Sequence, residues 1–400
     1  MAVNIMQTVP NPDRPVSPVR TFALWQMGFR PFYLLASVFA ALSIPLWVAQ
    51  FVGVLPRPYV DDALWHGYEM LFGYASAVIA GFLLTAVRTW SGQATVTGMP
   101  LMGLVALWLA ARLLIMTPYP LAALIVNVAF PLAVGLALAV PLIRANNRRN
   151  YFVIGLLASL ALASLMFQLA SRGAVTWPVH ASLQVGLDLV LFLVAVIAGR
   201  VVPMFTNNGI PVARARRHPL IEQFALGGLV ALLALDILQP APQLVALATT
   251  ATAVVHAARL WLWQPWRTWR VPLVWILHAG YAWVVVYLVL RSLASFGLFP
   301  VSLAIHALTI GVIGSMTIGM MTRTSRGHTG RTLEAGRVEM VCFLLMQCAA
   351  LSRVAGGLFF PAQYVSSVIV ASVCWSAAFV VFVIGYLPVL LWSRIDGKPG

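Results

Sequence analysis

The stretch His306-Ala-Leu-Thr-Ile-Gly-Val-Ile-Gly-Ser-Met-Thr-Ile-Gly-Met-Met-Thr-Arg-Thr-Ser-Arg-Gly-His328-Thr-Gly330 is apolar and rich in glycine, and it ends in basic residues. Its apolar part is typical of a helix that crosses a membrane. His306 lies inside that part, and His328 lies just past the basic end. An ionisable side chain at such a depth is a candidate for function, and a neutral imidazole can bind haem iron or copper without bringing a formal charge into the membrane.

The composition of the whole chain indicates a membrane protein. Of its 400 residues, 61% are hydrophobic and only 9% are charged, whereas about a quarter of the residues of a soluble domain are charged. Windows of roughly 20 apolar residues predict an all-α polytopic fold of about twelve membrane helices. The expected spans lie near residues 28–53, 65–88, 99–117, 119–143, 150–171, 178–203, 220–238, 242–263, 271–293, 301–323, 336–359 and 363–392.

The distribution of arginine predicts the orientation. The net charge of +15 comes from short clusters between spans, which favours membrane topology over a nucleic-acid partner. Most clusters fall on one side if the helices alternate, so both termini are expected in the cytoplasm. The opposite loops are expected to carry only scattered cations, namely Arg57, Arg172, Arg291 and Arg353. We expect a flexible cytoplasmic tail over residues 1–27, a single membrane domain over 28–393 and a short cytoplasmic tail over 394–400.

The histidines within the spans sort into two groups by depth, because each residue of a helix rises by about 1.5 Å. An outer group consists of His66, His180 and His306, and an inner group of His256, His278 and His328. Two groups on opposite sides suit two redox centres, or a haem and a copper. The alternative is that each imidazole only satisfies a local hydrogen bond. Ligation is the favoured interpretation for His66, His278 and His306, and the local bond for His180 and His256.

Other polar residues point to a chemical interior. His180, Gln184 and Asp188 are spaced to lie on one helix face, where they could relay protons. Glu69 follows His66 by one turn and could accept its second N–H group. Arg112 needs an anionic partner, for which a haem propionate, Glu69 or Asp188 would serve, unless its side chain reaches to the interface.

Small residues recur every four positions on two of the expected spans, at Gly73, Ala77 and Gly81 and again at Ala307, Gly311, Ser315 and Gly319. Such a pattern lets helices approach closely in lipid. It could also leave room for the flat face of a porphyrin.

Four ordered motifs carry a resemblance to a known family. They are the block from Trp65-His66 to Ala86, Gly199-Arg200-Val-Val-Pro203-Met-Phe205-Thr206-Asn207, Pro272-Leu-Val-Trp-Ile-Leu-His278, and the segment from His306 to Gly330. Together they resemble the NnrS family over nearly the whole chain.

The resemblance implies a multi-pass protein of the bacterial inner membrane that contains haem and copper and takes part in denitrification and the response to nitrosative stress. His66, His278, His306 and His328 match the family's recurrent histidines and become its candidate metal ligands, with His180, His256 and Arg112 as further candidates for holding a cofactor. The chain has no Cys-x-x-Cys-His motif, so a non-covalent b-type haem is expected. The family block usually reads Trp-His-x-His-Glu, and here Tyr68 replaces the second histidine. Either a copper ligand is absent, or Tyr68 has another role.

The expected chemistry is the handling of nitric oxide at a haem, with His306 or His66 as axial ligands on the outer side and His278 on the inner side. A reductive version would join two NO molecules to nitrous oxide, with a quinol as a candidate electron donor. Glu69, Asp188 and Tyr68 are then the candidate catalytic groups. The alternatives are a protein that binds NO or metal without turnover and a twelve-helix transporter without cofactor. A haem–copper oxidase is set aside, because the adjacent histidine pair of that superfamily is absent.

Overall fold

The computed structural model describes residues 21–55 and 62–398, which form a bundle of helices. The elements are α1 (Phe29–Phe51), α2 (Asp62–Tyr68), η1 (Glu69–Ala75), α3 (Ser76–Ser91), α4 (Gly98–Leu114), α5 (Pro120–Arg144), η2 (Arg148–Asn150), α6 (Phe152–Ala170), α7 (Val179–Gly209), α8 (Pro219–Leu238), α9 (Pro242–Leu262), η3 (Pro265–Arg267), α10 (Pro272–Ser295), α11 (Val301–His306), η4 (Ala307–Gly314), α12 (Ser315–His328), α13 (Arg337–Phe359), η5 (Pro361–Gln363) and α14 (Tyr364–Leu391).

The expected all-α polytopic fold is confirmed. Within the described residues, 11 helical runs are long and apolar enough to cross a membrane. The shorter apolar helix α4 has 17 residues, and at about 1.5 Å per residue it approaches the thickness of a bilayer's hydrocarbon core. These helices match the twelve expected spans. The outward faces carry large exposed apolar side chains such as Leu42, Leu136 and Ile384, as a lipid solvent requires.

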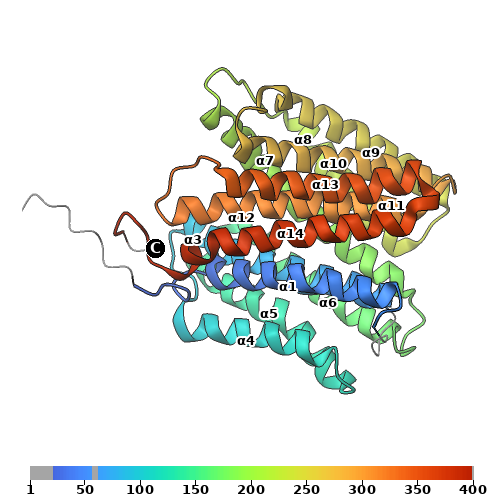
Figure 1. The fold of residues 1–400 in the computed structure, drawn as a ribbon, viewed down its shortest axis with the longest axis horizontal. Coiled ribbons are helices and arrows are strands. Elements are labelled where there is room, and N and C mark those ends of the chain that lie inside the picture. Colours follow the sequence, from blue (N-terminus) through green and yellow to red (C-terminus); the bar gives the residue numbers. More distant parts are fainter. Residues whose placement is uncertain (1–20, 56–61, 399–400) are drawn as a thin grey trace, which may run out of the picture.

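The helices run mostly along one direction (Figure 1), with α4 and α5 at one edge of the bundle and α8 and α9 at the opposite edge. Helix α1 packs against both α3 and α14, and α10 packs against α9 and η4. The runs α2–η1–α3 and α11–η4–α12 each form one span, over Ala63–Ser91 and Val301–His328, and their best windows are 83% and 61% buried. They are therefore interior helices, where polar side chains can be kept from lipid.

The two ends of the described chain meet at one end of the bundle. Phe22 and Trp392 form an isolated antiparallel bridge, and the Ala23 N–H donates to the Leu391 carbonyl at 2.7 Å. Residues 21–23, within the tail expected over residues 1–27, thus pair with Leu391 and the segment that follows α14. Residues 1–20 of that expected tail, and Arg57, lie outside the described residues.

Arg30 ties this junction to the bundle. Its side chain is fully buried, and its Nη1 donates to the carbonyl oxygens of Val389, Leu390 and Trp392 at 3.2, 3.0 and 2.8 Å. These carbonyls belong to the last turn of α14 and the residue after it, where backbone acceptors have no partner within the helix. Arg30 supplies that partner.

The two central spans contain π-helical segments, η1 and η4. At the end of η1 the Ser76 N–H reaches back to the carbonyl of Leu71, five residues earlier. The Gly73 carbonyl also accepts the indole N–H of Trp108 at 3.0 Å, so the altered backbone makes a bond to α4. The two spans are joined by the hydroxyls of Tyr74 and Thr317, 2.6 Å apart. Single π-helical turns within α-helices are rare and occur frequently at functional sites.

The regularly spaced small residues serve close packing. A Cβ added at Gly311 would lie 2.5 Å from Trp283, and one at Gly81 would lie 2.9 Å from Phe32. Neighbouring side chains already fill the space beside these glycines, which favours helix packing over room for a porphyrin.

Candidate metal centre

A cavity of about 390 Å³ lies between the two π-helical spans and the helices that surround them. Its wall is mostly apolar and includes side chains from α1, α2, η1, α7, α11, η4, α13 and α14. The three histidines that we assigned to the outer group, His66, His180 and His306, all line it. The structure therefore brings this group together.

The rings of His66 and His306 face one another across part of the cavity. Their centroids are 6.4 Å apart and their planes differ by 11°. The ring of His66 also stacks on that of Trp47, at 4.3 Å between centroids. His306 Nδ1 lies 2.6 Å from the carbonyl oxygen of Ser302. Because a carbonyl only accepts, Nδ1 carries the proton and Nε2 keeps its lone pair for a ligand.

The centroid spacing is that of two imidazoles that share one metal ion, but a ring nitrogen presents its lone pair in the plane of the ring, so these stacked rings must turn before both bind the same ion. At a nitrogen–metal distance of about 2.0 Å, two imidazoles on opposite sides of one metal have centroids roughly 6 Å apart. Among the described residues, no group of three or more His, Cys, Asp and Glu side chains is arranged to hold a metal ion. Haem needs at most two axial ligands from the protein, so the pair of histidines and the apolar wall fit that group.

His180 differs from the other two histidines of this cavity. It lies at the start of α7 and is exposed, whereas His66 and His306 are partly buried. Its imidazole belongs to the rim.

The inner histidines occupy separate environments. His256 is completely buried, with Nδ1 2.7 Å from the Tyr281 hydroxyl and Nε2 3.2 Å from the Ala225 carbonyl. Both of its nitrogens are thus engaged in hydrogen bonds. His278 Nε2 lies 2.8 Å from the Thr206 hydroxyl, and its buried Nδ1 has no hydrogen-bond partner among the described residues.

His328 lies at the end of α12, where its ring is 5.9 Å from the ring of Phe29. Arg394 donates to its backbone carbonyl at 3.0 Å. The contacts of His256, His278 and His328 therefore lead to different partners, and their ligation of a metal stays a prediction.

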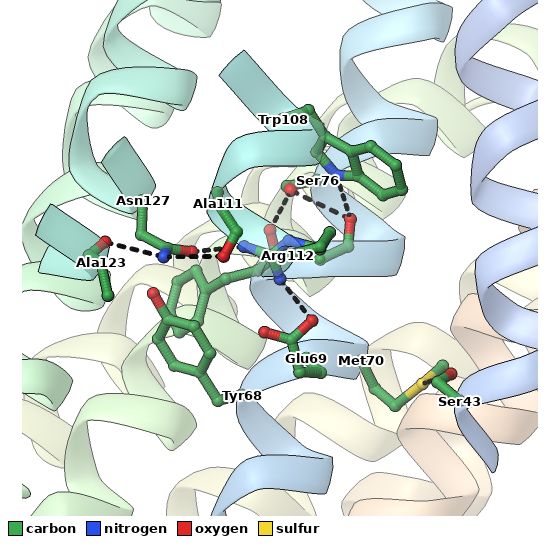
Figure 2. Close-up of polar contacts among 12 residues, drawn as sticks. Ser43, Tyr68, Glu69, Met70, Ser76, Trp108, Ala111, Arg112, Ala123 and Asn127 are labelled. Atoms are coloured by element: carbon green, nitrogen blue, oxygen red, sulfur yellow. Dashed lines mark hydrogen bonds and ion pairs between the residues drawn. The ribbon is translucent and has the colours of Figure 1, made fainter. Parts of the chain in front are cut away.

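Glu69 is the partner of Arg112, one of the alternatives that the sequence left open. Figure 2 shows Glu69 pointing toward Arg112, and the two form an ion pair of 2.7 Å between side chains that are 1% and 7% exposed. The other end of the guanidinium bonds to Asn127. Glu69 therefore balances Arg112, and no hydrogen bond joins it to His66 in the described part of the chain.

Tyr68 faces away from the cavity, toward α6. Its hydroxyl lies 2.7 Å from the Ser164 hydroxyl and accepts a hydrogen bond from Gln168 at 2.9 Å. Residues two apart on a helix point in different directions, so Tyr68 packs against α6 while His66 lines the cavity.

Asp188 belongs to a buried polar cluster that reaches the cavity. Gln184 lines the cavity and donates to Asp188 at 2.9 Å and to the Tyr287 hydroxyl at 3.1 Å. Arg291 lies 3.5 Å from Asp188 and pairs closely with Asp236. Two carboxylates share one guanidinium, so one proton on the pair makes the cluster neutral in a region where net charge is costly.

The interpretation of Arg291 and Arg353 as cations of the outer loops was wrong. Arg291 lies within α10 and Arg353 within α13, and they are 8% and 3% exposed. Arg353 lines the cavity and is the main site residue that the sequence analysis missed. A signal was present, because Arg353 falls inside the expected span 336–359, where a charged residue is itself a sign of function.

Comparison with known proteins agrees with the motifs. The family model described as NnrS protein matches residues 23–394, which confirms the resemblance over nearly the whole chain. A comparison with curated proteins finds no match.

Proposed function

The chain belongs to the NnrS family, and on that premise we propose that it binds haem between His66 and His306 and handles nitric oxide in the bacterial inner membrane. The observation that carries the proposal is the pair of nearly parallel imidazoles, 6.4 Å apart, in an apolar cavity. His306 comes directly before η4, and His66 lies three residues before η1. The proposal thus rests on two histidines placed where both central spans change their helical form.

When bound, the haem would supply an iron for NO, which is uncharged and soluble in lipid. Because iron held by both imidazoles has no open position, NO would bind only where one of the two is released. The residues around it have distinct tasks. Ser302 fixes the imidazole of His306 through Nδ1, and Trp47 stacks on the ring of His66 and limits its motion. The apolar wall limits access of water, which strengthens electrostatic interactions inside the cavity.

A reductive activity would need protons near the cavity. Joining two NO molecules to one nitrous oxide and one water consumes two protons and two electrons, and a quinol is the class of donor that we propose. Asp188 and Asp236 are placed to hold a proton beside Arg291, and Gln184 connects Asp188 to the cavity wall. Without a donor, the same cavity would act as a protective NO-binding site.

Copper is the second metal in the proposal. The thioether of Met70 lies in the cavity wall with His66 and His306, and thioether and imidazole are both ligands that copper(I) accepts. Because Tyr68 bonds to α6, copper would have to bind without a ligand at that position. The iron and copper contents of the purified protein distinguish a haem site from a copper site.

The test is the optical spectrum of the detergent-purified full-length protein in its oxidised, dithionite-reduced and NO-treated states. We expect reduced haem bands that shift with NO, and we expect His66→Ala and His306→Ala to lower haem content. His218→Ala is the matched control, because His218 is exposed in the loop before α8. A colourless protein after expression with ample haem and iron would contradict the proposal and favour the transporter alternative.

A further inference from the structure

We propose that Arg353 and Tyr364 form an anion-binding subsite in this cavity, for a planar monoanion that presents two oxygen atoms, such as a carboxylate. Arg353 is 3% exposed and lines the cavity together with Tyr364, His66 and His306. Its Nη2 donates to the Tyr364 hydroxyl at 2.8 Å, and the guanidinium lies over the Tyr364 ring at 4.8 Å. Its Nη1 is buried and has no hydrogen-bond partner in the described chain.

Arg30 and Arg112 also have buried nitrogens without a partner, but among the buried arginines of the described bundle only Arg353 has neither a carboxylate nor a set of backbone carbonyls beside it. Arg112 pairs with Glu69, and Arg259 and Arg291 pair with carboxylates of α8. Arg30 has three backbone carbonyls. The described residues provide no carboxylate for Arg353. A buried guanidinium without a counter-charge is costly, so the cavity is suited to an anion that the described side chains do not supply.

The donors of the subsite set the chemistry of the ligand. Nη1 of Arg353 carries two N–H groups that have no partner in the described chain, and the Tyr364 hydroxyl, which already accepts from Nη2, has its own proton to donate. Two donors side by side match two oxygens of one planar anion, and a hydrogen bond with a charged donor is stronger than a neutral one. The surrounding wall is apolar, which disfavours ions that keep a large hydration shell.

Two sources supply such a group. One is a carboxylate side group of a tetrapyrrole held between His66 and His306, and this case rests on the proposed function. The other is a free oxyanion of small size, such as nitrite or formate, which does not depend on haem. Both ligands would accept hydrogen bonds from the same two donors, but they predict different anion responses and haem contents for the purified protein.

The experiment measures the thermal unfolding temperature of detergent-purified full-length protein, haem-free and haem-loaded, as sodium formate or sodium nitrite is added. Sodium chloride at equal ionic strength corrects for general salt effects. The variants are Arg353→Gln and Tyr364→Phe, with Arg172→Gln as the matched control. Arg172 follows α6; it is exposed and bonds to Gln168 and the Pro120 carbonyl, outside the cavity.

We expect formate and nitrite to stabilise the haem-free protein saturably, and Arg353→Gln to weaken the apparent affinity by about tenfold or more. The Arg172→Gln protein should respond like the wild type. If the tetrapyrrole carboxylate is the natural occupant, the anions act only on haem-free protein and Arg353→Gln loses haem. If a free oxyanion is the occupant, both forms respond and haem content does not change.

The proposal is overturned if neither anion stabilises the wild-type protein and Arg353→Gln retains haem like the wild type. Should Arg353→Gln fail to accumulate, the titration of the wild type and the Tyr364→Phe protein decides by the same criteria. A protein that takes up no haem when haem is supplied, yet binds formate through Arg353, would contradict the proposed function and leave the anion subsite standing.

Discussion

Replacing Arg112 by methionine should strongly destabilise the fold, because Glu69 would lose its counter-ion inside the bundle. The Glu69 side chain is 1% exposed, its Oε2 bonds to Arg112 at 2.7 Å, and its Oε1 has no hydrogen-bond partner in the described structure. Removing one partner of a buried pair costs about 3–5 kcal/mol of unfolding free energy, since the other charge stays buried. We expect a loss of this size for Arg112→Met.

The double variant Glu69→Met, Arg112→Met separates this cause from loss of packing. It removes both charges, so most of the lost stability should return. A deficit of about 1–3 kcal/mol should remain, because the Asn127 side-chain oxygen loses its bond from Arg112 and stays buried.

Both variants can be compared with the wild type by reversible unfolding with sodium dodecyl sulfate in lipid–detergent micelles, followed by circular dichroism. Arg217→Met is the control. Arg217 also pairs with a glutamate, but its side chain is 46% exposed, and an exposed pair contributes about 0–1 kcal/mol. The reasoning is refuted if Arg112→Met changes stability no more than the control, or if the double variant is as unstable as the single one.

Three further predictions concern other contacts. Gly73→Ala should lose about 1–3 kcal/mol in the same titration, because its Cβ would lie 2.5 Å from Arg112 Nη1; stability equal to the wild type would contradict this. Asp188→Asn should leave stability within about 1 kcal/mol of the wild type, since the Arg291–Asp236 pair remains, and should slow NO consumption in an electrode assay about 100-fold if Asp188 supplies protons; an unchanged rate would remove it from the catalytic residues. Arg394 holds the pKa of the Asp396 carboxyl at about 2 through hydrogen bonds of 2.8 and 2.6 Å. Because the pKa is depressed, the stabilisation that this pair gives to the folded state is present above the carboxyl's ordinary pKa of about 3.9 and is lost as the pH falls through the pKa of the folded state. Hydrogen exchange at the Ile395 amide, corrected for its intrinsic pH dependence, should therefore show constant protection from pH 7 to 5 and weaker protection only in strong acid.

The sequence was a good guide to the number of spans, to their bounds and to the grouping of the outer histidines. Lipid offers no hydrogen bonds to the backbone, so apolar runs of sufficient length must be helices, and their bounds follow from hydropathy. Depth follows from the rise per residue, which is why His66, His180 and His306 could be grouped before their common cavity was known. The family motifs added the expectation of metal ligands among them.

Which side chains face one another was decided only by the packing of all the helices. Glu69 could have served His66 or Arg112 by spacing alone, and the approach of α4 to η1 selects Arg112. His256 and His278 were expected at comparable depth, yet Tyr281 and Thr206 give them separate partners. The sequence of one helix does not specify which neighbouring helix each of its side chains will face. The cavity beside Arg353 and the π-helical turns near its histidines were therefore decided by the tertiary structure alone.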